Sequence, residues 1–266
     1  MIGHGIMPHT KHREDAADRE PVVEEFDVEL GGRRVHYRKG GAGPPVLLLH
    51  GGASDSRDWL SAIEALSDRY TLYAPDMVGF GLSHRSNDSY RLQDFVGFAL
   101  DFMQAMGMEC PAVVGHSLGG RVCIEIASSE PARVGRLVLV DTAGFGDLTL
   151  WGNLMGTVFW TLRRVLRLPK PYPQFAKGSG GYDDWACHDL LSRLQVPTLV
   201  VWSRFDPYYS LRDARKAVAL MPQARLAVLS CCGHAPHIRR RRQFNSIVGD
   251  FLDEALSHEG LGCTGV

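Results

Sequence analysis

A serine that stands between two glycines is the residue of this sequence with the clearest chemical potential. Ser117 lies in the segment Gly115-His116-Ser117-Leu118-Gly119, directly after the apolar run 111–114. A serine hydroxyl is a poor nucleophile, and it becomes reactive when a sharp strand-to-helix turn exposes its oxygen to a base. Such a turn requires small residues two positions before and two positions after the serine. The pattern therefore predicts that Ser117 is a nucleophile.

The segments on either side of Ser117 fit a strand-to-helix turn. Val113 and Val114 are β-branched residues typical of a strand, and the apolar positions of 121–128 have helical spacing. The serine is then expected at a helix start, where unpaired backbone N–H groups favour developing negative charge. We predict that the N–H of Leu118 is one donor of an oxyanion hole.

A second glycine-containing loop follows the apolar run 46–49, in the segment His50-Gly51-Gly52-Ala53. Because glycine lets the backbone approach a substrate closely, the N–H of Gly52 is the predicted second oxyanion donor. Loss of such a donor costs about 3 to 4 kcal/mol of activation free energy. His50 is expected to hold this loop in place and is not counted as the base.

Candidates for the base and its carboxylate follow two later strand-like runs. Asp206 follows the run 198–202, and His234 follows the run 226–229. Open parallel sheets gather their chemistry at the carboxyl ends of the strands. The order Ser117, Asp206, His234 therefore predicts a nucleophile, an acid and a base after three sheet strands, in the chain order known for one fold in particular.

The sequence resembles the α/β-hydrolase family over about 26–256. Five segments carry the resemblance in the expected order: HGG at 50–52, PDMVGFGLS at 75–83, GHSLGG at 115–120, RFDPY at 204–208 and CGHAPHI at 232–238. The resemblance implies an α/β fold with a mostly parallel eight-stranded sheet, helices on both faces and a short helical cap inserted after strand 6. It also implies that Ser117 attacks, that His234 is the general base, and that Asp206 orients the imidazole.

One other carboxylate is an alternative to Asp206. Asp141 ends the strand-like run 137–140, and some members of the family place the acid there. Asp206 is preferred because the proline turn after it directs its side chain across the strand ends. Dehalogenation and epoxide opening need an aspartate nucleophile in this fold, and position 117 is a serine.

Alternating strand and helix patterns follow a predicted hairpin at 26–38 and indicate a mostly parallel sheet. We expect the following organisation: a flexible N-terminal arm (1–20), a first part of the core (21–144), a helical cap (145–190), a second part of the core (191–258) and a flexible tail (259–266).

The cap segment is dense in large apolar residues over 148–168, and their spacing fits a helix with one broad apolar face. In the family the cap shapes the substrate pocket, so the resemblance makes Trp151, Met155, Phe159 and Trp160 candidate substrate-binding residues. The uncharged stretch 148–162 is shorter than the roughly 20 residues of a membrane span, and basic residues follow it. No stable membrane insertion is expected, while transient contact with a lipid surface is left open.

Composition excludes several kinds of partner. The 266 residues are 45% hydrophobic and carry a net charge of −1, so no strong field attracts nucleic acid or membranes broadly. Six cysteines lack zinc-ligand spacing and no apolar export segment is seen, which predicts a cytoplasmic protein with reduced thiols, no metal and no cofactor.

The adjacent pair Cys231 and Cys232 is expected to serve packing. The run 239–242 of four arginines is interpreted as a solvated face, the alternative being attraction of acidic substrates or partners.

Three functions fit these residues. The preferred one is an enzyme that hydrolyses small-molecule carboxylic esters of short to medium acyl chain through an acyl-enzyme intermediate. The second is a carbon–carbon bond hydrolase of ring-cleavage products, because PDMVGFG resembles the corresponding loop of that subfamily; lactone hydrolysis and acyl transfer use the same residues. The third is a non-catalytic binding protein, which an intact set of Ser117, Asp206 and His234 disfavours. The sequence does not indicate the oligomeric state.

Overall fold

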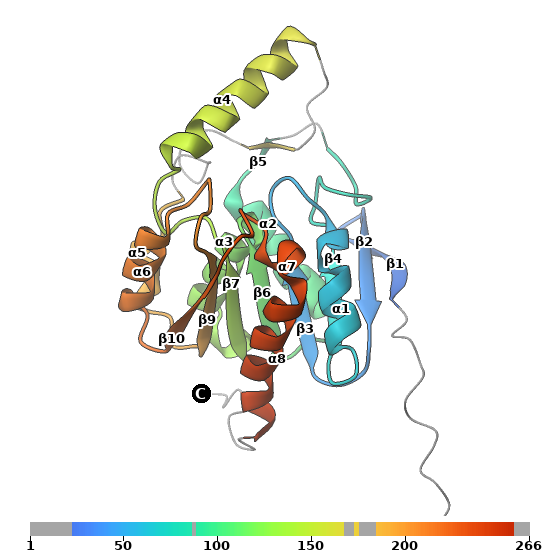
Figure 1. Cartoon of the computed structure of the whole chain (residues 1–266). Helices are drawn as coiled ribbons and strands as arrows, with labels where there is room; N and C mark the ends of the chain where they lie inside the picture. The colour runs from blue at the N-terminus through green and yellow to red at the C-terminus, as the bar shows by residue number, and fades with distance from the viewer. Residues whose placement is uncertain (1–22, 87–88, 168–172, 176–184, 258–266) are drawn as a thin grey trace, which may run out of the picture.

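An eight-stranded sheet forms the centre of the molecule (Figure 1). The structure is a computed structural model, and it describes residues 23–86, 89–167, 173–175 and 185–257. The strand order is β1-β2-β4-β3-β6-β7-β9-β10, with helices on both faces. The predicted fold class is confirmed. The predicted N-terminal arm (1–20) and tail (259–266) lie outside the described residues.

The sheet begins with the predicted hairpin. Strands β1 (Glu24–Leu30) and β2 (Arg33–Gly40) are antiparallel and are joined by Gly31 and Gly32, whose φ angles of 54° and 74° favour glycine. Strand β2 pairs in antiparallel fashion with β4 (Thr71–Pro75), and every later pairing of the sheet is parallel. The remaining strands are β3 (Pro45–Leu49), β6 (Ala112–His116), β7 (Arg136–Val140), β9 (Thr198–Ser203) and β10 (Ala224–Leu229).

Each face of the sheet has its own apolar core. Side chains that alternate along β3, β6, β7 and β9 point to opposite faces, as the pleat requires. One face packs against α1 (Leu60–Leu66) and α8 (Arg241–Ser257), around the buried ring of Trp59. The other face packs against a larger set of helices: α2 (Leu92–Ala105), α3 (Leu118–Ser129), α5 (His188–Leu191) and α6 (Leu211–Leu220).

The predicted cap lies between β7, the sixth strand of the main sheet along the chain, and β9. It contains α4 (Leu150–Val165) and the short strand β8 (Gln174–Phe175). Strand β8 pairs in parallel with β5 (Ser89–Tyr90) and makes a second, two-stranded sheet that the sequence analysis did not predict. Helix α4 stands apart from the helices that cover the sheet (Figure 1). The domain boundaries proposed from the sequence stay a prediction.

Four cysteines, Cys123, Cys187, Cys231 and Cys232, are free thiols. Cys110 is disulfide-bonded, so the expectation of wholly reduced thiols is wrong at this residue. In the part of the chain that the structure describes, every helix falls short of the length and apolarity needed to cross a membrane.

Candidate active site

The turn between β6 and α3 carries Ser117 in a backbone conformation that few residues adopt. Its φ and ψ angles are 51° and −111°, and the first residue of α3 is Leu118. Close contacts explain the glycines around it. A Cβ atom on Gly119 would lie 2.3 Å from the carbonyl oxygen of Leu49, and one on Gly115 would lie 2.4 Å from that of Gly119. The turn therefore depends on glycine, and the strain places Ser117 at the strand end, as the sequence pattern predicts.

His234 and Asp206 come together from two other strand ends. His234 Nδ1 lies 2.7 Å from Asp206 Oδ2, and the Asp206 side chain is fully buried. The second carboxylate oxygen of Asp206 accepts the backbone N–H groups of Tyr208 at 2.7 Å and Tyr209 at 3.3 Å. With both oxygens held, Asp206 is a fixed acceptor for the imidazole. The predicted acid and base are thus hydrogen-bonded to each other.

The imidazole of His234 has one nitrogen left for chemistry. Because Nδ1 faces Asp206, the nitrogen available to a serine hydroxyl is Nε2. Among the described residues, no hydrogen bond joins Ser117 Oγ to His234. Catalytic hydrogen bonds are often long before substrate binds, so this geometry is compatible with a base that engages the serine in the substrate complex.

Asp141, the alternative acid, is also buried, but it binds a different partner. Its two carboxylate oxygens accept the N–H of Ser203 at 2.7 Å and the hydroxyl of Ser203 at 2.6 Å. Burial, followed by the nearby charge of Asp206, raises the pKa of Asp141 to about 7. Asp141 therefore keeps its proton to a higher pH than an ordinary aspartate does.

Gly52, the residue of one predicted oxyanion donor, lies against the side chain of Leu118, the residue of the other. A Cβ atom on Gly52 would be 3.6 Å from the Leu118 side chain, and the loop that contains Gly52 is bound to α3 by the Gly119 N–H, which donates to the His50 carbonyl at 3.2 Å. Within the described ranges, neither the Gly52 N–H nor the Leu118 N–H donates to a protein acceptor. That these two N–H groups form an oxyanion hole stays a prediction.

His50 holds this loop, as expected. Its Nε2 accepts the Met77 N–H at 2.9 Å, and its Nδ1 donates to the Gly51 carbonyl at 2.8 Å. The ring is completely buried, and desolvation lowers its pKa. Both nitrogens are occupied by backbone groups, so His50 is not available as a base.

His116 is a residue of this site that the sequence analysis missed. Its Nε2 lies 2.6 Å from the backbone carbonyl oxygen of His234, which ties the serine turn to the loop of the base. Burial, and then the nearby His237 and His234, hold the pKa of His116 well below its usual range, so the ring is neutral and donates through Nε2. The residue occupies the variable position before the serine in the motif, which carries no signal for such a role.

Two groups of side chains have the chemistry of metal ligands. In the first, Asp141, Asp206 and His234 are engaged in the hydrogen bonds described above. In the second, Asp58, His116 and His237 place ligand atoms within 4.8 Å of one another. The rings of His116 and His237 pack 4.5 Å apart, and His237 also packs on Trp59 at 4.6 Å. The second group is thus an aromatic stack in which His237 Nε2 also lies 3.9 Å from Asp58 Oδ2.

The candidate substrate-binding residues on α4 are exposed. Trp151, Met155 and Phe159 are 68%, 45% and 37% exposed, and the side chain of Trp160 lies outside what the structure describes. The helix is attached at its start, where the Thr149 N–H donates to the Tyr208 carbonyl at 2.8 Å. That these residues line a substrate pocket stays a prediction.

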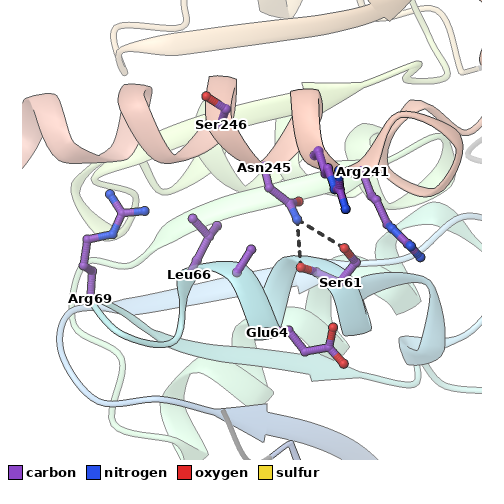
Figure 2. A pocket seen from close by; sticks show the side chains of 9 residues that line it. Ser61, Glu64, Leu66, Arg69, Arg241, Asn245 and Ser246 are labelled. Atoms are coloured by element: carbon purple, nitrogen blue, oxygen red, sulfur yellow. Dashed lines mark hydrogen bonds between the residues drawn. The ribbon is translucent and has the colours of Figure 1, made fainter. Parts of the chain in front are cut away.

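A cavity of about 550 Å³ lies elsewhere, between α1 and α8 (Figure 2). Arg69, Arg241 and Arg242 line it, and Asn245 donates to the carbonyl and hydroxyl oxygens of Ser61 at 2.8 Å and 3.2 Å. The two cavity residues Arg241 and Arg242 belong to the run of four arginines at 239–242, which extends from the end of α7 (Pro236–Arg239) to the start of α8. None of the predicted site residues lines this cavity, so it is separate from the candidate active site.

Comparisons with known proteins agree with this architecture. A family model described as the alpha/beta hydrolase fold matches residues 44–177, half of the chain. One relative, a dihydrolipoyllysine-residue acetyltransferase component of an acetoin cleaving system from Cupriavidus necator, is 34% identical over 73% of this chain, which covers 49% of that protein. This chain therefore spans about half the length of that relative.

Two further relatives are covered almost completely. A 2-hydroxymuconate semialdehyde hydrolase of Pseudomonas sp. is 28% identical over 86% of this chain and 94% of that protein. The crystal structure of a meta-cleavage product hydrolase variant superposes with a TM-score of 0.74 and 28% identity, over 86% of this chain and 98% of the other.

Proposed function

We propose that this chain, which belongs to the alpha/beta hydrolase fold family, is a serine hydrolase that cleaves small-molecule carboxylic esters of short to medium acyl chain. The observation that carries the proposal is the hydrogen bond of 2.7 Å between His234 and the fully buried Asp206, set at the strand ends near a strained Ser117. A buried, doubly held carboxylate favours one imidazole tautomer, which leaves Nε2 as a proton acceptor.

The proposed reaction has two halves. Ser117 Oγ attacks the ester carbonyl while His234 Nε2 takes the hydroxyl proton, and the Gly52 and Leu118 N–H groups stabilise the negative oxygen. The C–O bond to the alcohol then breaks, and His234 returns the proton to the departing alkoxide. In the second half His234 removes a proton from water, which attacks the acyl-enzyme, and the serine leaves with that proton. Asp206 stays ionised throughout.

Hydrolysis of a carbon–carbon bond in ring-cleavage products is the second candidate. It is favoured by two relatives, the 2-hydroxymuconate semialdehyde hydrolase and the meta-cleavage product hydrolase, which are covered over at least 94% of their length. Against it, the loop after β3 reads HGGASD, without the glycine and proline usual in that subfamily, and Ala235 replaces the tryptophan that usually follows the histidine.

The cytoplasmic location predicted from the sequence stays a prediction.

The experiment that tests the covalent mechanism uses a fluorophosphonate probe and mass spectrometry. The probe should modify Ser117, and Ser117→Ala should abolish labelling and lower kcat by several orders of magnitude. Ser129→Ala, at the exposed end of α3, is the matched control and should behave as the wild type. Labelling of another serine, or undiminished turnover in Ser117→Ala, overturns the mechanism.

Substrate class is tested separately, with p-nitrophenyl esters of increasing acyl length and a ring-cleavage dienoate measured on the same enzyme. The proposal requires the highest kcat/KM for an ester. A higher kcat/KM for the dienoate, again lost in Ser117→Ala, assigns the enzyme to the second candidate.

A further inference from the structure

Helix α4 presents an unusual surface for a helix of a folded protein. Large apolar side chains that recur three and four positions apart cover one half of it. They are all substantially exposed: Leu150 89%, Trp151 68%, Leu154 52%, Met155 45%, Val158 50%, Phe159 37%, Leu162 56% and Val165 73%. Exposed apolar patches of this extent mark interaction sites, because water disfavours them. The face is therefore a docking surface, and its charge indicates the partner.

Helix α4 meets the body of the protein near its start, at Gly152. Gly152 is buried, and a Cβ atom there would be 3.1 Å from Tyr208 Cα. Gly156 and Arg163 are half-buried, and the other described side chains of the helix are exposed. The apolar half of the helix is therefore open to solvent, and the helix projects from the body of the protein (Figure 1).

The charged residues within α4 and directly after it are all basic. Arg163 and Arg164 lie in its last turn and Arg167 follows it, and Arg164 and Arg167 are exposed. The sequence contains no aspartate or glutamate from 148 to 182. The net charge of the whole chain is close to zero, so this basic end is a local feature. An apolar face with arginines beside it complements a surface that is apolar inside and negatively charged outside.

We propose that α4 docks on anionic lipid bilayers, lying along the surface with its apolar half in the headgroup region. The 16-residue helix is too short to span a bilayer, and a helix with this pattern lies in the interface plane. Because α4 begins at Thr149, which is bound to Tyr208 beside the Asp206–His234 pair, docking brings the carboxyl ends of the strands toward the lipid. This inference concerns α4 and does not depend on ester hydrolysis.

Vesicle co-sedimentation tests the docking. The full chain should bind vesicles of equal parts phosphatidylcholine and phosphatidylglycerol, bind pure phosphatidylcholine far more weakly, and release as salt screens the charge. Arg164→Gln with Arg167→Gln should lower the partition coefficient by roughly 25-fold, since each arginine at a lipid surface contributes about 1 kcal/mol, or about fivefold. Leu154→Glu with Val158→Glu should abolish binding.

Matched controls lie on other elements. Arg241→Gln with Arg242→Gln removes the same charge at the start of α8, and Leu220→Glu places a charge at a 43% exposed leucine of α6. Both variants should bind vesicles as the wild type does. Turnover of a water-soluble ester by the α4 variants verifies that they are folded, and vesicle binding is measured whether or not the protein cleaves esters.

Tryptophan fluorescence identifies the contact surface. Trp59, Trp185 and Trp202 are buried, so in a Trp160→Phe background a blue shift and quenching by brominated lipid report Trp151. Binding that is equal on neutral vesicles, or unchanged in the α4 variants, overturns the proposal. The proposal is also overturned if the protein does not bind vesicles and is instead a dimer that Leu154→Glu converts to a monomer. The apolar face would then bind a second copy of the chain.

Discussion

At the scale of single residues, the site is defined by which carboxylate reaches the imidazole. Two aspartates follow neighbouring strands, and only Asp206 is hydrogen-bonded to His234. Asp141 uses both oxygens on Ser203. The two residues therefore have different chemistry although their positions at strand ends are alike.

The first prediction separates the two aspartates by kinetics. Asp206→Asn should lower kcat by roughly 10⁴, because the amide favours the imidazole tautomer with its proton on the wrong nitrogen. Asp141→Asn keeps groups that can pair with Ser203 and should retain most of the activity. Single-turnover and steady-state rates on one p-nitrophenyl ester provide the measurement. A large loss of activity in Asp141→Asn together with a small loss in Asp206→Asn would show that Asp141 is the acid and would contradict the prediction.

At the scale of elements, the serine turn depends on the approach of α3 to β3. Gly119 lies against Leu49, where a methyl group would be 2.3 Å from a backbone oxygen that cannot move without shifting the strand. Sequence and structure agree here because the steric demand is local and appears directly as glycine in the pattern.

The second prediction follows from that contact. Gly119→Ala should lower the free energy of unfolding by about 1 to 3 kcal/mol, the usual effect of overpacking, and should lower labelling of Ser117 as the turn shifts. Denaturant titration measures the first effect and a fluorophosphonate the second. Gly156→Ala in α4, where a Cβ atom meets nothing within 4 Å, is the matched control: it should leave the labelling unchanged and should not lower the free energy of unfolding, because alanine is the better helix former.

The sequence predicts elements better than it predicts contacts between distant ones. The main sheet, the serine turn and the order of the site residues follow from local patterns and strand ends. The pairing of β5 with β8 involves two residues on each side and leaves no pattern. The apolar spacing of α4 is the same whether its face packs on a core or meets solvent, so exposure could not be predicted. The bond from His116 to the His234 carbonyl depends on two loops that meet only in the fold.

The third prediction concerns the cap as a determinant of acyl length. If Trp151, Met155 and Phe159 close over a bound substrate, added methylenes should raise kcat/KM, each by up to about 0.8 kcal/mol while fully buried. Acyl chains of about C4 to C8 should then exceed acetate, and Phe159→Ala should flatten the preference more than it changes acetate turnover. A maximum at acetate that is insensitive to Phe159→Ala would show that these side chains do not line the acyl site.

At the scale of the whole molecule, the buried carboxyl of Asp141 links folding to pH. The pKa of Asp141 is about 7 in the folded protein against an ordinary value of 3.8. Between these values the folded state binds more protons than the unfolded chain, so the free energy of unfolding falls as pH rises from about 4 to about 7.

The fourth prediction applies that linkage. Asp141→Asn removes the titrating group. The free energy of unfolding of this variant, relative to that of the wild type, should therefore increase by about 2 to 4 kcal/mol between pH 4 and pH 8. Urea titrations of both proteins across this range provide the measurement. Asp213→Asn, at an aspartate of α6 whose pKa is lowered by hydrogen bonds to Ser210, is a useful comparison because it should lose stability relative to the wild type as pH rises from acid. Parallel pH profiles for Asp141→Asn and the wild type contradict the assignment.

The strand order also determines how the molecule loses activity on heating. Ser117 follows β6, which is paired on both sides by β3 and β7, whereas His234 follows β10, an edge strand held by β9 alone. Edge elements open at lower free-energy cost than central ones, and amides of β10 should exchange with solvent before those of β6. The warmed protein should then pass through a population in which Ser117, the proposed nucleophile, is still attached to an intact sheet while His234, the proposed base, has been released. Thermal inactivation is expected to begin below the melting temperature, and on cooling the lost activity should return as one edge strand pairs again.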